Sequence, residues 1–114
     1  IAHNDKFGDY GGTLIMIHQL QTIRFHILYG HLSRQSISTL QAGIYLSRGE
    51  QLAALGQPFE NGNWPPHLHF QIIEDIGAWE GDYPGVCSLA EQTKYLDNSP
   101  DPDCILSLNK FVSL

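Results

Sequence analysis

The chain has 114 residues, a mass of 12.8 kDa and a formal net charge of −6, with 12 acidic side chains against 6 Lys and Arg. This length fits one compact domain. Nucleic-acid binding normally needs a basic patch, and the sequence has none, so nucleic acid is not an expected partner. Hydrophobic residues make up 42% of the chain, which excludes disorder by composition. The longest apolar run, Leu14–Ile17, is far shorter than the ~18 residues of a membrane span.

β-Structure is predicted for the first three quarters of the chain. The glycine pair at 11–12 precedes a run of β-forming residues at 13–18. A second run at 22–29 alternates apolar side chains from Ile23 to Tyr29, which is the period of a half-buried strand. The link at 18–21 is short, so the two runs are expected to form a hairpin.

The middle of the chain is more ambiguous. Segments 40–44 and 46–56 are interpreted as short strands broken at glycines. A helix over Gly49–Leu55 is the competing interpretation, because Glu, Gln, Leu and Ala favour helix, but its flanking glycines leave barely two turns. After an irregular loop at 61–66, a further strand is predicted over His67–Ile73.

From residue 76 the chain is punctuated by glycine and proline. A mostly extended, loop-rich C-terminal extension is therefore expected at 76–114, packing on the β domain of residues 1–75 or linking it to a following domain. One short helix is predicted at 88–96, with Ser88 as its N-cap and Glu91 completing a capping box. Cys87 and Cys104 lack a Cys-x-x-Cys spacing and are expected to be free thiols rather than a bridge.

The histidines carry the clearest chemical signal. His67 and His69 are two apart in a predicted strand, so both imidazoles leave one face, while Leu68 is expected to point with Phe70 and Ile72 into the core. Such a pair presents two imidazoles to one site, as zinc binding or acid–base chemistry requires. His31 ends the preceding strand, where site residues often lie. The alternative is that these histidines are ordinary exposed side chains of a strand.

Two further histidines, His18 and His26, lie within strand runs. For both, a structural histidine with satisfied hydrogen bonds is the favoured interpretation.

Four motifs occur in a specific order. They are residues 11–18, Tyr-Gly-His-Leu-Ser at 29–33, residues 52–56 and Pro-His-Leu-His-Phe-Gln at 66–71. Together they resemble the lysostaphin-type zinc metallopeptidases, which are peptidoglycan endopeptidases, over about Gly8 to Ile73. The resemblance implies a mainly β fold, the duplicated hybrid motif, and hydrolysis of peptide bonds by a metal-activated water.

Matched to that pattern, His69 is implied as a ligand of one zinc ion, and His31 and His67 as catalytic residues. The family takes a further His and Asp from an earlier His-x-x-x-Asp motif. The segment His3-Asn4-Asp5 has the wrong spacing, so those ligands are expected upstream of Ile1. The chain is therefore expected to be N-terminally truncated and inactive alone.

Two aromatic residues, Tyr10 and Trp64, are candidates for a substrate groove, and packed aromatics are the alternative. The expected partner is a peptide or a peptidoglycan-like substrate.

Residues 81–86 and 99–106 resemble the segment that follows this module in large bacterial proteins. There the module lies between a phosphotransferase-like domain and a class III aminotransferase domain. This resemblance implies a multi-domain, cytoplasmic parent for which peptidoglycan is a doubtful substrate. Typical family members belong to the cell envelope or are secreted.

Two other functions compete with the peptidase. One is a non-catalytic binding or scaffold module that kept the fold within a multi-domain enzyme including an aminotransferase. The other is a lipoyl- or biotinyl-type carrier, which needs a modifiable lysine at a hairpin tip. Lys6, Lys94 and Lys110 lie outside the hairpin, so the carrier is disfavoured.

Overall fold

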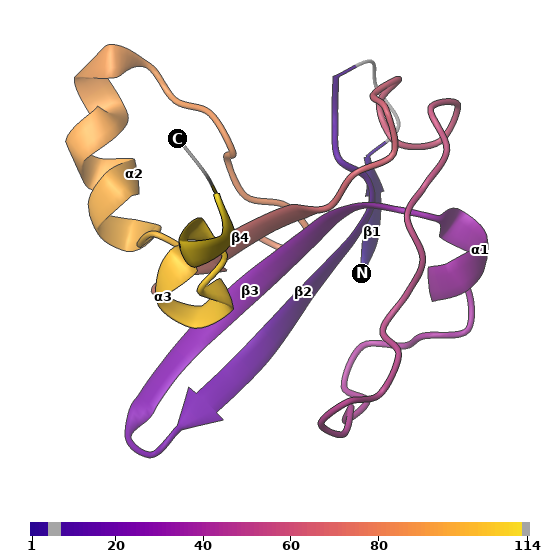
Figure 1. Ribbon diagram of the computed structural model, residues 1–114, viewed down its shortest axis with the longest axis horizontal. Coiled ribbons are helices and arrows are strands. Elements are labelled where there is room, and N and C mark those ends of the chain that lie inside the picture. The colour runs from indigo at the N-terminus through magenta and orange to yellow at the C-terminus, as the bar shows by residue number, and fades with distance from the viewer. Residues whose placement is uncertain (5–7, 113–114) are drawn as a thin grey trace.

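The computed structural model describes residues 1–4 and 8–112, and the side chains of residue 1 and residues 8–112. At its centre lies an antiparallel sheet with strands in chain order (Figure 1). The strands are β1 (Ala2–Asn4), β2 (Gly11–Leu20), β3 (Ile23–Leu32) and β4 (His69–Ile73). The predicted fold class is confirmed, because the domain is mainly β with a loop-rich tail.

The long hairpin of β2 and β3 dominates the sheet. The predicted link at 18–21 was placed too early, because His18 still pairs with Phe25 and Leu20 pairs with Ile23. The chain turns at residues 21–22, where Gln21 adopts a left-handed φ of 55°. We call residues 17–25 the outer end of the hairpin, and residues 11–14 with 30–32 its site end.

The strands predicted at 40–44 and 46–56 were wrong, and so was the competing helix over 49–55. Within the described residues this region forms only an isolated bridge between Leu55 and Leu32. Positive φ angles of 88° at Gly43 and 80° at Gly49 interrupt any ladder. A short helix that the sequence did not predict, α1 (Arg34–Ile37), begins instead after its N-cap, Ser33.

Both faces of the sheet are covered from the site end to the middle of the hairpin. In Figure 1 the loop that follows α1 lies to one side of the strands and the tail to the other. On the loop side, Leu14 and Leu32 pack against Ile37. On the tail side, Leu28 and Ile73 pack against Tyr83.

Coverage on both sides explains why Ile72 and Ile73 are both buried although they point to opposite faces of β4. The expectation that Leu68 enters the core was wrong, since it is 46% exposed. The observed strand begins at His69, two residues after the predicted start at His67. His67 and Leu68 therefore belong to the preceding loop.

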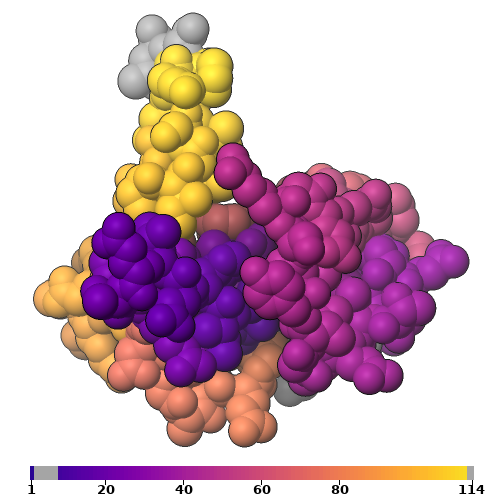
Figure 2. Space-filling view, turned by 90° about the horizontal axis from the view of Figure 1, so that it is seen from below, coloured from indigo at the N-terminus to yellow at the C-terminus, as the bar shows by residue number. Residues whose placement is uncertain are grey.

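The tail contains more helix than predicted. The expected helix at 88–96 is present as η1 (Leu89–Glu91) continued by α2 (Gln92–Asn98), whereas α3 (Asp103–Leu106) and η2 (Asn109–Phe111) were not predicted. The capping box does not form, because Ser88 Oγ donates to the Glu91 carboxylate (2.9 Å) instead of capping a backbone N–H. Figure 2 shows the yellow segment, near the C-terminal end of the described chain, projecting from the body.

Both cysteines, Cys87 and Cys104, are free and exposed, as predicted. Among the described residues, no helix has the length and apolar character needed to cross a membrane.

Candidate active site

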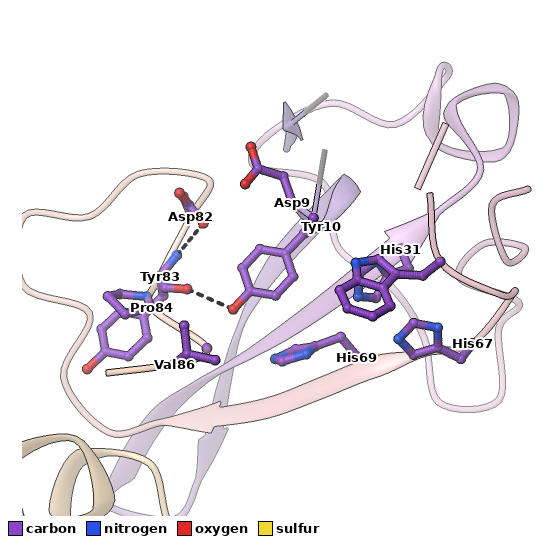
Figure 3. A pocket seen from close by; sticks show the side chains of 12 residues that line it. Asp9, Tyr10, His31, His67, His69, Asp82, Tyr83, Pro84 and Val86 are labelled. Carbon is purple, nitrogen blue, oxygen red and sulfur yellow. Dashed lines mark hydrogen bonds between the residues drawn. The ribbon is translucent and has the colours of Figure 1, made fainter. Parts of the chain in front are cut away.

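A cavity of about 390 Å³ lies between the site end of the hairpin and the tail (Figure 3). All five side chains singled out from the sequence line it, namely His31, His67, His69, Tyr10 and Trp64. The His31 ring centroid lies 4.2 Å from that of His67 and 6.0 Å from that of His69. The fold thus gathers three imidazoles from two strands and a loop.

A β-bulge aims His31 at this cavity. In β3, strict alternation would point His31 to the same face as Tyr29, away from His69, which pairs with Gly30. The register with β2 shifts between Gly12 and Leu14, so β3 holds one extra residue there. His31 takes a left-handed φ of 62° at this point, and its ring turns toward the other histidines.

Three hydrogen bonds hold His31 in that conformation. Its N–H donates to Tyr10 O (2.6 Å), its carbonyl accepts from Gly56 N (2.7 Å), and its Nδ1 bonds Asn61 O (2.8 Å). A carbonyl only accepts, so Nδ1 carries the proton and Nε2 is the free acceptor. Burial lowers the pKa of His31. The hydrogen bond to Asn61 opposes this shift, whereas the nearby His67 and His69 rings add to it.

The other two imidazoles, His67 and His69, differ from each other in tautomer. His67 Nδ1 bonds Pro65 O (2.6 Å), which leaves Nε2 as the acceptor, as in His31. His69 instead uses Nε2, bonded to Gln71 Oε1 (3.0 Å). The amide orientation of Gln71 is fixed because its Nε2 donates to Pro84 O (3.0 Å) and Ser99 Oγ (3.2 Å). His69 therefore donates from Nε2 and keeps Nδ1 as its acceptor.

Tyr10 packs between the histidines and the tail. Its ring centroid lies 4.6 Å from that of His69 and 5.8 Å from that of His31. The hydroxyl donates to Tyr83 O (3.1 Å), as Figure 3 shows. Burial, reinforced by the nearby Asp82 and Asp9 charges, raises the pKa of Tyr10 to about 12. The phenol is therefore neutral at physiological pH.

The prediction that His18 and His26 have satisfied hydrogen bonds was wrong. His18 Nε2 and His26 Nδ1 are buried without a hydrogen-bond partner among the described residues. Neither residue lines the cavity. The side chain of His3 lies outside the described residues.

The histidines present do not by themselves fit a complete zinc centre. A catalytic zinc usually has three protein ligands and one open position. Among the described side chains, no group of three His, Cys, Asp or Glu residues is arranged to hold a metal ion. His69 keeps one free ring nitrogen, whereas Asp9 and Asp82 line the cavity without forming such a group with it.

Several residues that shape the site were missed from the sequence. Asn61 and Gln71 hold His31 and His69, and the tail lines the cavity with residues 82–86. Gln71 lies two residues after His69, so the strand period places both on one face. No local pattern indicated that the tail would return to the strand ends.

These features define a mainly β domain with a histidine-lined cavity at one end of its sheet. Residues 1–80 match the sequence profile of Peptidase family M23, which covers well over half of the chain, so the chain belongs to that family. Neither a curated protein nor a solved structure matches the chain significantly.

Proposed function

We propose that the chain is part of a zinc-dependent metalloendopeptidase domain that hydrolyses peptide bonds, in the family those of peptidoglycan-type peptides. The observation that carries the proposal is the meeting of His31, His67 and His69 in one cavity of an M23 chain. His67 and His69 lie 36 and 38 positions after His31 in the sequence. A cluster of imidazoles that lines a cavity at the end of a sheet is more typical of a functional site than of a stabilising core.

His31 and His67 supply the proton chemistry in this proposal. Each donates Nδ1–H to a carbonyl, so each has Nε2 as its acceptor. The lowered pKa of His31 keeps its ring neutral near pH 7, ready to accept a proton from the attacking water. Once protonated, an imidazole donates a hydrogen bond to the charge that develops on the substrate carbonyl.

For the metal, we propose His69 as one ligand and a His and an Asp upstream of Ile1 as the others. The free Nδ1 of His69 supports this role. Tyr10 and Trp64 are proposed as walls of the substrate groove. Residues 76–114 are proposed as an extension of the domain, since residues 82–86 line the same cavity.

The wider context is also a proposal. The tail motifs support a cytoplasmic, multi-domain bacterial parent in which the module lies between phosphotransferase-like and class III aminotransferase domains. In that setting the assembled cell wall is a doubtful substrate, and the chain would act on short glycine-rich or cross-linked peptides. A membrane or nucleic-acid partner finds no support in the charge or composition of the chain.

The experiment uses the parent protein with its upstream sequence, because zinc content and hydrolysis must be measured together. We expect one zinc per chain, and cleavage of glycine-rich or cross-linked peptides. His69→Ala should lose both zinc and activity. His67→Ala should keep zinc and lose at least ~100-fold in kcat/KM, as expected when a proton-transfer group is removed.

His26→Gln is the matched control, since His26 lies outside the cavity, and it should keep both zinc and activity. A parent without an upstream His-x-x-x-Asp motif, or with zinc but no change in His67→Ala, contradicts the proposal.

A specific observation favours a second candidate, a non-catalytic binding or scaffold module. Tyr10 packs on the His69 ring and is fixed by its bond to Tyr83 O (3.1 Å). A fixed aromatic wall is a common feature of pockets that bind ligands, and it needs no catalytic group beside it. A parent that binds no zinc, and that binds peptide equally well after His67→Ala, would favour this module over the peptidase.

A further inference from the structure

A closed ring of hydrogen bonds surrounds the bulge residue. The carbonyl of His31 accepts from Gly56 N (2.7 Å), and the carbonyl of Gly56 accepts from Asn61 Nδ2 (3.1 Å). The carbonyl of Asn61 then accepts from His31 Nδ1 (2.8 Å). Gly56 and Asn61 are the two ends of a short loop. The ring of hydrogen bonds therefore connects both ends of this loop with one residue, His31.

Asn61 is the buried centre of this ring, with a side chain that is 0% exposed. Its remaining bonds all go to Trp64, whose carbonyl accepts from Nδ2 (2.9 Å) and whose N–H donates to Oδ1 (2.9 Å). Both amide protons and the amide oxygen are thus used. Since a buried amide that loses a partner is costly, the loop has one favoured conformation.

The same loop also supplies the partner of the second imidazole. Trp64 precedes Pro65, whose carbonyl bonds His67 Nδ1 (2.6 Å), and the Trp64 ring lies 6.4 Å from that of His67. Fixing Trp64 through Asn61 therefore sets where this carbonyl lies. One buried amide controls the acceptors of two imidazoles that come from different elements.

We propose that Asn61 is a positioning residue that holds His31 as the Nδ1–H tautomer, with Nε2 aimed into the cavity. Through Trp64 it imposes the same tautomer on His67. The use of these lone pairs in catalysis rests on the proposed function. The tautomers themselves do not, because they are properties of the chain in the absence of substrate.

Long-range ¹H–¹⁵N NMR of the labelled 114-residue chain at pH 7.5 tests the proposal, because nitrogen shifts distinguish protonated from unprotonated ring positions. We expect His31 and His67 to carry the proton on Nδ1. His69, held by Gln71, should carry it on Nε2 and so provides an internal contrast. A proton on Nε2 of His31, or a mixture of its tautomers, would overturn the proposal.

Variants separate positioning from a merely structural role. Asn61→Ala should turn the His31 signal into a tautomer mixture and leave that of His69 unchanged. Asn61→Asp keeps the acceptor for Trp64 N but loses the amide donor to Gly56 O, so it should retain the Nδ1–H form of His67 better than that of His31. Asn63→Gly is the matched control, since Asn63 is exposed, has a φ of 68° and makes no side-chain hydrogen bond in the described chain.

If Asn61→Ala does not fold, the spectra of the unmodified chain and of Asn61→Asp test whether Asn61 sets the tautomers. An Asn61→Ala spectrum identical to that of the unmodified chain would overturn the proposal. Failure of the proposed function is seen separately, as a parent protein that binds no zinc or cleaves no peptide while the tautomers remain as assigned.

Discussion

The hairpin of β2 and β3 carries histidines toward both of its ends, and within the described residues only the site end provides them with hydrogen-bond partners. At the site end, His31 bonds the Asn61 carbonyl at 2.8 Å. Toward the outer end, His18 Nε2 and His26 Nδ1 are buried with no partner among the described residues. The same pair of strands therefore presents imidazoles in two different chemical settings.

The difference lies in what covers the strands. Near His31 the loop and the tail pack on opposite faces and bring carbonyl groups with them. At the outer end, Ile17, Leu20 and Ile23 are 56%, 66% and 63% exposed. For His31 the strand sets only the direction of the side chain, and the hydrogen-bond partner comes from the loop. The following predictions test this contrast, beginning with the largest expected effect.

Gly62→Ala should disrupt the site end most. Gly62 has a φ of 88°, and a Cβ there would overlap the backbone of Asp9. Left-handed strain costs about 1–3 kcal/mol, and the overlap adds to it, so we expect a loss of more than about 4 kcal/mol in unfolding free energy. Urea denaturation measures this loss.

Gly43→Ala is the matched control, because Gly43 has the same φ of 88° and no atom within 4 Å of the added Cβ. It should cost only about 1 kcal/mol. Equal losses at the two glycines would show that close backbone packing does not define the site end.

Ile73→Ala should lower the unfolding free energy by about 2–5 kcal/mol, because it opens a cavity beside Leu28 and Tyr83. Ile23→Ala, the same substitution at the outer end, should change it by less than about 0.5 kcal/mol. Thermal denaturation of the two variants under one buffer condition makes the comparison. Similar losses would mean that the outer end is covered in solution.

The smallest effect concerns pH. Burial, helped by the nearby His26, lowers the pKa of His18 from 6.5, so the unfolded chain takes up this proton first as pH falls. Stability supplied by neutral His18 is then present above pH 6.5 and is lost at lower pH. Urea unfolding between about pH 5 and 7 should show this decline.

His18→Phe retains an aromatic ring beside Phe25, on which His18 stacks at 5.4 Å, and removes the titrating group. Its stability should fall less steeply over the same range of pH. An unchanged slope would mean that His18 is free to take up its proton in the folded chain.

The parts of the fold that depend on local pattern were predictable. Alternation in residues 13–29 gave the hairpin, and spacing gave a strand that contains His69. The region 40–56 was not, because Leu40 and Leu52 are partly buried by packing on the Leu14, Leu32 and Ile37 cluster without forming a ladder. Periodicity does not distinguish a strand from an irregular loop that is pinned by apolar side chains.

The histidine motifs in the sequence were enough to indicate the family and to select His31, His67 and His69 as candidates, because the order and spacing of motifs can be read from the sequence itself. Only the tertiary structure decided which nitrogen of each ring is free. That depends on the carbonyls of Asn61 and Pro65 and on the amide of Gln71, together with the bulge that turns His31. The sequence places histidines at these positions, and the hydrogen bonds of the folded chain determine the tautomer of each ring.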